Sequence, residues 1–526
     1  MSQPPAPVLG PRNTSRIQER HRNLAGLLLI GLVVLAAVLR FWRLGDWGFE
    51  GDEIYTLRDS LRPRLTNPRP LIYFLNHFLI GPLMPLNELG LRILPALFGV
   101  LAIPAFYLVA RRLFGTRAAL FGTLLLAVNP LHVYQSQYAR YWSLVVLMSA
   151  VYPYAIYVGV RERNAGWLTL GLITAVLAVL AHPVSLLLMG GLALFLLLQL
   201  RRDTVRDLWR HQGVRWGALV LVILAVIAGA RSISLLENWI AAHDAKTWVP
   251  DRVFPERRPP IIKQLGIFLA FAEGLTLPVT LLGALGICQL WQREDRSKAL
   301  LLACLFAFPV LFILAVSFRV AVSPTYFLPA APVIFLAAGL FLSRLADVDL
   351  GLRPRWLVPA ALTAVVLIPG VPTLISQYRD GRRFDFRGAA QWLEPRLAPG
   401  DRILSEQYRL IKHYLPGLPV EAIPQDTASM MRAMRALHRS GEEPALWLVA
   451  PAPSHAFRGN LKRGGVLGWI YENCQLRNTL GVSRIDFRQQ YLQVYRCPPA
   501  KSGAIEPAEE LQPSEQVRVP AGRVQR

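Results

Sequence analysis

The sequence predicts a polytopic α-helical membrane protein with a small α/β domain near its C-terminal end. Of its 526 residues, 53% are AVILMFWYC and only 17% are charged, and the mean hydropathy is +0.35. The apolar residues form runs long enough to cross a bilayer, and these runs stop near residue 377. This much apolar surface must be buried, which excludes a disordered chain and argues against a soluble multidomain enzyme.

The net charge does not indicate a nucleic-acid partner. The chain has 57 basic and 34 acidic residues, which gives a net charge of +23. Arginine occurs mainly in short clusters between the apolar runs, as the positive-inside rule expects of cytoplasmic loops. The charge is therefore assigned to membrane topology, and no nucleic acid is expected to bind.

The first membrane span follows a polar arm. Residues 1–23 are rich in proline and arginine and are predicted to be a disordered cytoplasmic arm. The run 24–39 resembles a signal peptide, but further apolar runs follow it, so we expect an uncleaved signal-anchor. With it, about eleven spans are predicted, the others at 91–110, 118–135, 141–160, 166–182, 184–200, 215–235, 265–291, 299–317, 326–343 and 356–376.

The loops alternate in composition along the chain. Arginine clusters at 111–117, 161–163, 201–210, 293–298 and 344–355 mark one set as cytoplasmic. The other set is richer in Trp, Tyr, Pro and acidic residues and comprises 43–90, 132–140, 236–264 and 318–325. The N-terminus is therefore expected inside, and an odd number of spans places the C-terminus outside. Residues 24–376 form the predicted membrane domain.

Residues 377–500 are predicted to form a small α/β domain on the outer face. A helix is expected at 386–397, and strands are expected at 402–405, 445–450 and 491–495. Cys474 and Cys497 lie here, and an oxidising compartment would favour a disulfide between them. Residues 501–526 are polar and are expected to be disordered.

The first outer loop contains the strongest catalytic candidates. Glu50, Asp52 and Glu53 lie close to a predicted span and are framed by aromatic residues such as Trp47 and Phe49. Such a carboxylate near the bilayer surface could take a proton from an attacking hydroxyl group. The alternative is an ordinary solvated acidic loop.

Several short motifs follow in order on the predicted outer side. They are Asn-Pro-Arg-Pro-Leu-Ile-Tyr at 67–73, Leu-Arg-Ile-Leu-Pro with a later Phe-Gly at 91–99, Ala-Arg-Tyr at 139–141, His182-Pro183 and Thr325-Tyr326. With the first-loop Asp-Glu and the segment 384–404, they resemble bacterial relatives of protein O-mannosyltransferases and aminoarabinose (lipid A) transferases. The resemblance covers most of residues 24–415. Relatives often carry Arg-Tyr at the place of Thr325-Tyr326. Either Arg319 replaces that arginine at the donor phosphate, or this lipid-phosphate contact is missing.

The resemblance implies a GT-C fold of the glycosyltransferase family 39 type in a bacterial inner membrane, with a periplasmic C-terminal domain. The implied donor is a polyprenyl-phosphate-linked sugar, and the acceptor is a hydroxyl group of a glycolipid, polysaccharide or protein. Asp52 is the expected general base, by resemblance and because the acceptor hydroxyl needs deprotonation. Glu53 could orient the acceptor or help to hold a divalent cation. The reverse assignment of the two acids remains open.

The remaining site candidates are arginines and aromatic residues. Arg69, Arg92 and Arg140 are predicted near outer ends of spans, where a guanidinium group suits a donor phosphate. The alternative for each is snorkelling to lipid headgroups. Four further side chains could line the substrate site: Tyr55, Tyr73, Tyr141 and His182. The alternative is that the tyrosines lie at the membrane interface and that the histidine lies there or caps a helix.

The rival function is a membrane lipid or solute transporter. A transporter is expected to carry ionisable or broken segments near mid-membrane in paired halves. Here the predicted spans are nearly free of charge and the candidates gather on one face. That pattern favours an enzyme acting on one side of the membrane. The sequence names neither the sugar nor the acceptor, and it leaves the oligomeric state open.

Overall fold

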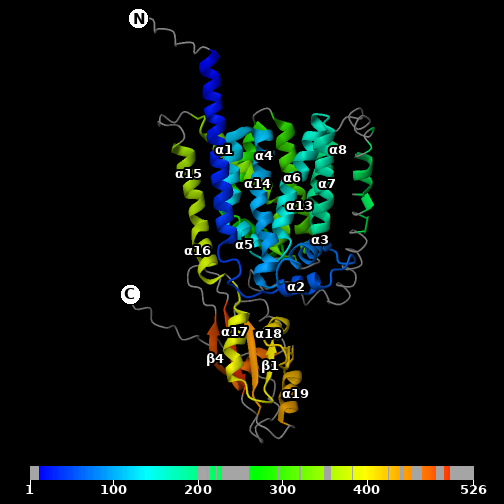
Figure 1. Ribbon diagram of the computed structural model, residues 1–526, viewed down its shortest axis with the longest axis vertical. Coiled ribbons are helices and arrows are strands. Elements are labelled where there is room, and N and C mark those ends of the chain that lie inside the picture. The colour runs from blue at the N-terminus through cyan, green and yellow to red at the C-terminus, as the bar shows by residue number, and fades with distance from the viewer. Residues whose placement is uncertain are drawn as a thin grey trace.

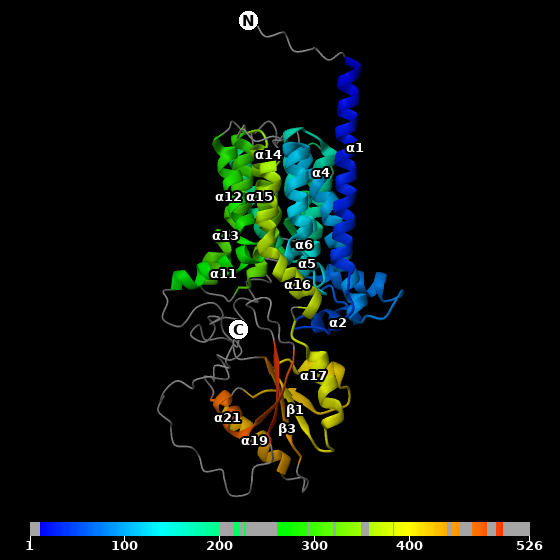
Figure 2. The same ribbon diagram turned by 90° about the vertical axis from the view of Figure 1, so that its left-hand side faces the viewer.

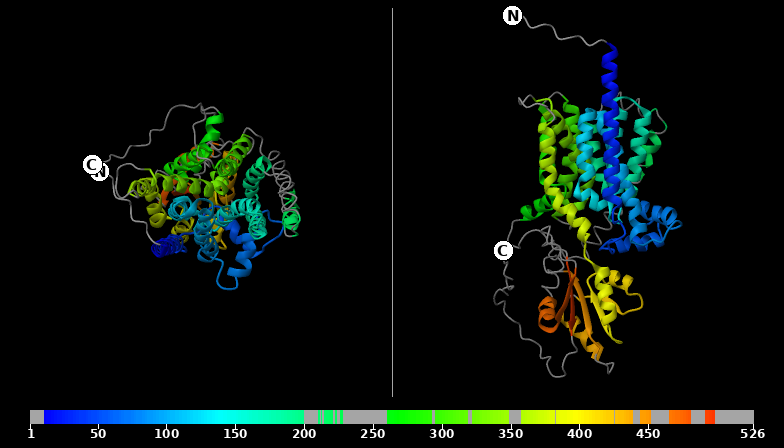
Figure 3. Two further views of the ribbon diagram at one scale, coloured as in Figure 1. Left: turned by 90° about the horizontal axis from the view of Figure 1, so that it is seen from above. Right: turned by 60° about the vertical axis from the view of Figure 1, so that its left-hand side comes forward.

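The computed structural model describes residues 11–199, 260–292, 295–318, 322–348 and 357–497, with scattered positions between 210 and 227 and without 382, 425, 439–443, 452–464 and 481–490. It consists of a helical bundle and a small α/β domain stacked along the long axis (Figures 1 and 3). Helix α1 (Pro11–Phe41) starts at the end of the bundle remote from this domain. Residues 11–23 are therefore helical, which corrects the expected disordered arm over that stretch.

The bundle is built from apolar helices. Within the described residues, six helices are long and apolar enough to cross a membrane, or seven if one bent pair is a single span. The predicted total of eleven is therefore not confirmed. The bundle contains α4 (Glu88–Val128), α5 (Pro130–Ser136), α6 (Trp142–Arg161), α7 (Ala165–Ala181), α8 (Ser185–Gln199), α12 (Leu277–Gln292), α13 (Arg296–Ser317), α14 (Ala331–Leu345), α15 (Leu357–Leu367) and α16 (Val371–Asp380).

Helix α4 contains the predicted span 91–110 and the first part of the predicted span 118–135, which continues into α5. Gly115 interrupts it with φ 83° and ψ 173°, a backbone conformation that glycine adopts readily. Arg92 near its start and Ala139 beyond its end both bind Glu53. The chain therefore reverses at Gly115 and returns to the end of the bundle where Glu53 lies.

The predicted span 265–291 is two helices rather than one. Helix α11 (Pro260–Gly274) and helix α12 meet at 99°. Helix α12 rises within the bundle, whereas α11 lies across its lower end, near the C-terminal domain (Figure 2). Thr276 at the bend has φ 70°, which is unusual for a β-branched residue. The predicted span is thus a bent pair of helices, and hydropathy alone does not reveal such a bend.

Glycines bring α14 into close contact with α4 and α12. A Cβ atom on Gly339 would lie 2.5 Å from the Ala118 carbonyl oxygen, and one on Gly286 would lie 2.0 Å from the Ala337 carbonyl oxygen. Real Cβ atoms do not approach backbone so closely. The three helices therefore pack backbone against backbone at these positions.

The first outer loop folds into short helices at the lower end of the bundle. They are α2 (Glu53–Leu61), α3 (Pro70–Leu75) and the π-helix η1 (Asn76–Ile80). Phe49 and Ile54 of this loop share a buried apolar cluster with residues of the C-terminal domain, among them Phe386 and Leu410. The loop is thus enclosed between the bundle and the domain.

The C-terminal domain is a five-stranded sheet with the order β2-β1-β3-β5-β4. Strands β1 (Arg402–Ser405), β2 (Val420–Ala422) and β3 (Leu446–Pro451) are parallel, and β5 (Leu492–Cys497) runs antiparallel between β3 and β4 (Gln475–Leu480). Helices α17 (Phe386–Leu393) and α18 (Tyr408–Tyr414) lie on one face, and α19 (Thr427–His438) and α21 (Val466–Asn473) on the other (Figure 2).

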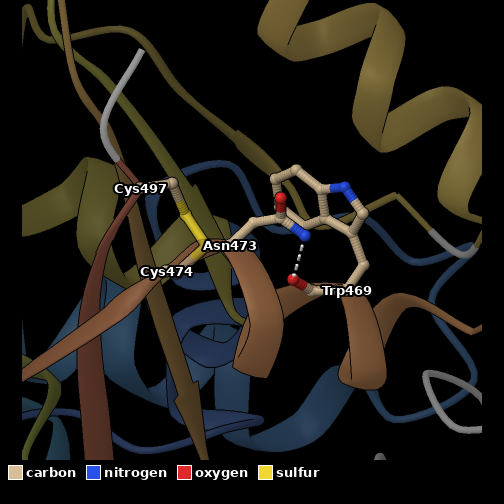
Figure 4. The surroundings of a disulfide bond; sticks show 4 residues. All are labelled: Trp469, Asn473, Cys474 and Cys497. Atoms are coloured by element: carbon tan, nitrogen blue, oxygen red, sulfur yellow. Dashed lines mark hydrogen bonds between the residues drawn. A yellow bond between two sulfur atoms is a disulfide. The ribbon is translucent and has the colours of Figure 1, made fainter. Parts of the chain in front are cut away.

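The structure confirms the small C-terminal sheet. The three predicted strands correspond to β1, β3 and β5, whereas β2 and β4 were not predicted. Cys474 and Cys497 form a disulfide, with their Cα atoms 4.1 Å apart. It joins the residue after α21 to the end of β5, beside a hydrogen bond from Asn473 to the Trp469 carbonyl oxygen (Figure 4).

Candidate active site at the first outer loop

The three acids of the first loop have different surroundings. Gly51 has φ 45°, so the chain turns sharply between Glu50 and Asp52. This turn leaves the Asp52 side chain 61% exposed, while Glu50 and Glu53 are buried at 8% and 0% exposure. Only Asp52 is therefore available to a substrate in solution or at the membrane surface.

Glu53 is a buried structural anion. Its Oε1 atom accepts hydrogen bonds from Arg92 Nε at 2.9 Å and the Ala139 amide at 2.6 Å. Its Oε2 atom accepts from Arg92 Nη2 at 2.7 Å, Arg383 Nη1 at 3.0 Å and the Glu50 amide at 3.0 Å. Burial opposes ionisation, but the two guanidinium groups outweigh it and lower the pKa of Glu53 to about 2.

Arg92 supports the loop and is not available to a phosphate. Besides its two bonds to Glu53, it donates to the carbonyl oxygens of Leu44, Trp47 and Gly48 at 3.3, 2.7 and 2.9 Å. These contacts use all five N–H donors of a guanidinium group. Its side chain is 0% exposed, so both the predicted phosphate contact and the snorkelling alternative are wrong for this residue.

Arg383 comes from the segment between α16 and α17 and was not among the predicted site residues. Its Nη2 atom donates to the Gln137 carbonyl oxygen at 2.6 Å. Its guanidinium carbon lies 5.5 and 5.4 Å from the ring centroids of Tyr134 and Tyr138. Together with its bond to Glu53, these contacts hold the linker against the loop.

The buried Glu50 carboxylate is less well neutralised by positive charge than that of Glu53. The Tyr134 hydroxyl donates a hydrogen bond to Glu50 Oε2 at 2.9 Å. Burial raises the pKa of Glu50 to about 7, and the nearby Arg383 charge offsets this only in part. Glu50 and Glu53 therefore differ in protonation over much of the acidic pH range.

Asp52 is paired with a buried arginine. Arg140 Nη2 lies 3.2 Å from Asp52 Oδ2, and Arg140 is 4% exposed. Arg140 also donates to the Asp52 carbonyl oxygen at 3.2 Å, to Thr56 Oγ1 at 3.3 Å and to the Tyr141 hydroxyl at 3.2 Å. Its Nε atom is buried without a hydrogen-bond partner in the described part of the chain.

Arg69 and Arg140 approach the same tyrosine. Their guanidinium carbons lie 5.1 and 4.8 Å from the centroid of the Tyr141 ring. Among the described residues, the buried Nε atom of Arg69 also has no hydrogen-bond partner. Two positive charges therefore flank the Tyr141 ring, one of them paired with Asp52, and both keep donor capacity for an anionic group.

Aromatic residues surround this pair of arginines. The Tyr141 and His182 rings lie 4.6 Å apart, and His182 stacks on Trp142 at 5.0 Å. Tyr326 lies 6.0 Å from both Trp142 and His182. The Tyr73 side chain is buried, and burial raises its pKa, while the charges of Arg140 and Arg69 oppose this rise. The structure therefore groups Asp52, Arg69, Arg140, Tyr73, Tyr141 and His182, and adds Tyr326.

Tyr55 lies outside this group. Its hydroxyl accepts a hydrogen bond from Arg409 Nη1 at 2.7 Å, on the side of the C-terminal domain. The substrate-lining role expected for Tyr55 therefore has no support in its contacts. Arg319 lies outside the described residues.

The residues around Glu53 do not fit a divalent cation. Both carboxylate oxygens are already occupied by guanidinium and amide donors. The described residues contain no cluster of three or more His, Cys, Asp or Glu side chains suited to a metal ion. The predicted metal contact at Glu53 is therefore not supported, and no chemical step is derived through a metal.

Comparisons with known proteins identify the fold and a family pattern in part of the chain. Residues 69–228 match the family model for dolichyl-phosphate-mannose-protein mannosyltransferase. No curated relative matches the chain significantly.

Two solved enzymes share the fold. ArnT from Cupriavidus metallidurans bound to undecaprenyl phosphate aligns at 15% identity over 89% of this chain and 97% of its own, with a TM-score of 0.55. The Archaeoglobus fulgidus oligosaccharyltransferase in complex with zinc and sulfate aligns at 15% identity over 81% of this chain and 68% of its own, with a TM-score of 0.51. The chain thus has the fold of the GT-C membrane glycosyltransferases, and residues 69–228 carry the sequence pattern of the mannosyltransferase family.

Proposed function

We propose that this protein transfers a sugar from a polyprenyl-phosphate donor to an acceptor hydroxyl group, with Asp52 as the general base. The observation that carries the proposal is the exposed Asp52 carboxylate, 3.2 Å from the buried Arg140, which shares the Tyr141 ring with Arg69. A proton acceptor and a site for a leaving anion are thereby adjacent. A glycosyl transfer from a lipid phosphate needs both.

The proposed reaction is a single displacement. Asp52 takes the proton of the acceptor hydroxyl, whose oxygen then forms a bond to the anomeric carbon of the sugar. The bond from that carbon to the phosphate oxygen breaks, and the polyprenyl phosphate leaves with the bonding electrons. Arg69 and Arg140 stabilise the growing negative charge on the phosphate.

The surroundings of the two adjacent acids support Asp52 over Glu53 as the base. Glu53 is enclosed, ion-paired to two arginines and hydrogen-bonded to two backbone amides. It has no lone pair left for a substrate proton. In this proposal Glu53 keeps the loop in place.

The proposed reaction takes place on the outer face of a bacterial inner membrane. The Asp52 loop lies on the same side of the bundle as the C-terminal domain, opposite the start of α1 (Figure 1). An N-terminus inside, as the arginine-rich loops predict, places this side in the periplasm. The Cys474–Cys497 disulfide suits that oxidising compartment.

The fold relatives support a lipid-linked donor and leave the acceptor open. One ArnT structure holds undecaprenyl phosphate, and one oligosaccharyltransferase structure holds a tethered acceptor peptide. We therefore expect a polyprenyl-phosphate sugar as donor. A glycolipid, polysaccharide or protein can supply the acceptor hydroxyl.

Transfer of a labelled sugar by the purified protein tests the proposal. Synthetic polyprenyl-phosphate sugars are supplied with cell-envelope extracts, and the labelled product is identified by mass spectrometry. The wild type should transfer label and Asp52→Asn should not. Movement of the lipid across the bilayer of proteoliposomes without any transfer would instead identify a transporter.

A further inference from the structure

Two arginines from different parts of the chain meet on one oxygen atom of Glu53. Arg92 Nη2 from the bundle lies 2.7 Å from Glu53 Oε2, and Arg383 Nη1 from the domain linker lies 3.0 Å from it. Both arginine side chains are almost fully buried, at 0% and 3% exposure. Glu53 therefore joins the bundle, the first loop and the C-terminal domain at one point.

This junction fixes the backbone on both sides of Asp52. Glu53 is the first residue of α2, and its carboxylate also accepts the Glu50 amide hydrogen at 3.0 Å. Asp52 lies between these two anchored residues, and its own carbonyl oxygen accepts the Thr56 amide at 3.3 Å. A shift of Arg383 would therefore be transmitted to the Asp52 carboxylate through Glu53.

The C-terminal domain makes further contacts with the same loop. The Tyr414 hydroxyl accepts the Phe49 amide hydrogen at 2.5 Å and donates to Glu88 at 2.8 Å. The His413 ring lies 5.5 Å from the Phe49 ring. These bonds show that the domain and its linker bind the loop over its buried side, away from the exposed Asp52 carboxylate.

We propose that Arg383 is a positioning residue that couples the C-terminal domain to Asp52 through Glu53. The inference rests on the proposed function, because it assumes that Asp52 is the base. Arg383 does not contact the Arg69–Arg140 pair in the described structure, so it sets the geometry of proton transfer and leaves donor binding to other residues. Misplacing a reacting group by about 1 Å can slow a reaction about 100-fold.

Kinetics of Arg383 variants in the full-length protein test this role. Arg383→Gln should lower kcat by about 100-fold and change the dissociation constant of the lipid-phosphate donor by less than about twofold. Arg383→Lys keeps the charge and should recover at least about tenfold of the lost kcat. Arg396→Gln is the matched control, because Arg396 is an exposed arginine of the same domain that donates to the Trp392 carbonyl oxygen and lies over the Trp392 ring.

Double variants show whether the effect passes through the base. In the Asp52→Asn background, Arg383→Gln should cause no further loss, because no proton transfer remains to be positioned. Arg383→Gln leaves the buried Glu53–Arg92 ion pair in place, so no buried charge at this junction is left without a partner in this variant. If Arg383→Gln does not fold, Arg383→Lys carries the test: it should lower kcat at unchanged donor affinity, and it should cause no further loss in the Asp52→Asn background.

Three results would overturn the inference. They are a wild-type kcat in folded Arg383→Gln, a matching loss of donor affinity, or a further loss on the Asp52→Asn background. If Asp52→Asn is inactive and Arg383→Gln is fully active, the inference fails while the proposed function stands. If Asp52→Asn itself retains normal transfer, the proposed function fails first.

Discussion

The carboxylates of Asp52 and Glu53, adjacent in sequence, lie in opposite environments: the Asp52 side chain is 61% exposed, and that of Glu53 is 0% exposed. Glu53 is the first residue of α2 and points inward to Arg92 and Arg383. Asp52 precedes the helix and points outward to Arg140. One residue of the pair is thus available for chemistry, and the other stabilises the loop.

The two acids should therefore respond differently to amide substitution. Asp52→Asn should reduce turnover by about 10²–10⁴-fold at unchanged thermal stability, because an amide cannot accept the proton. Glu53→Gln leaves two buried guanidinium groups without their anion and should lower the free energy of unfolding by about 3–5 kcal/mol. Parallel melting curves in detergent and transfer rates separate the two effects. An inactive but fully stable Glu53→Gln protein would exchange the roles.

Arginine geometry should matter at the anion site. Arg69→Lys and Arg140→Lys should raise KM for the lipid-phosphate donor or lower kcat, because lysine keeps the charge but loses the planar two-pronged geometry. Alanine should be worse at both positions. Arg58→Ala is a suitable control, since Arg58 is an exposed arginine of α2 paired with Asp59. Unchanged kinetics in both alanine variants would assign Arg69 and Arg140 to lipid headgroups or to structure.

Glu50 should make the stability depend on pH. Its pKa is about 7 in the folded protein and about 4.5 as an isolated group, so the folded state binds more protons between these values. Protonation of Glu50 therefore adds to the free energy of unfolding. This contribution, on the order of 3 kcal/mol, is complete below pH 4.5 and is lost as the pH rises through 7. Glu50→Gln should remove this dependence.

Melting temperatures from pH 5 to pH 8 check this expectation. The melting temperature of Glu50→Gln should rise relative to that of the wild type as the pH increases to about 7. Above that pH the difference between the two should stay constant. Glu394→Gln, which changes an exposed glutamate, serves as the control. A difference that does not vary with pH would show that Glu50 titrates normally.

The disulfide should stabilise the C-terminal domain. Cys474 and Cys497 are 23 positions apart, and closing a loop of this length is worth about 3 kcal/mol in the chain-entropy model. Replacing both by serine should lower the free energy of unfolding by that amount, whereas Cys288→Ala should have little effect. Thiol labelling of the denatured, non-reduced protein should find two reactive cysteines, Cys288 and Cys304. Four would show that the bond does not form.

Much of the site could be predicted from the sequence because its residues follow local patterns. Asp52, Arg69, Arg140 and His182 each lie next to an apolar run, on the predicted outer side, and the structure brings them together. The strands β1, β3 and β5 were predicted because they are apolar and lie within the domain. Strand β2 has three residues next to Pro419, and β4 is a largely exposed edge strand, so neither has a clear apolar pattern.

The rest depended on contacts between distant residues. Arg383 lies 330 positions from its partner Glu53, and no local pattern marks such a pair. Arg92, like Arg69 and Arg140, lies in a short motif near the end of a predicted span. Only the fold shows that Glu53 and three carbonyl groups accept hydrogen bonds from all its donors. The bend at Thr276 also leaves hydropathy unchanged. In each case the missing information was three-dimensional.

The glycine contacts of α14 limit how the bundle can admit a lipid chain. Because a methyl group on Gly286 or Gly339 would collide with backbone atoms, α12, α14 and α4 cannot slide or rotate against one another without separating. These three helices therefore form a fixed wall. The isoprenoid tail of the proposed donor is therefore expected to enter through a side of the bundle where helices meet by side chains alone.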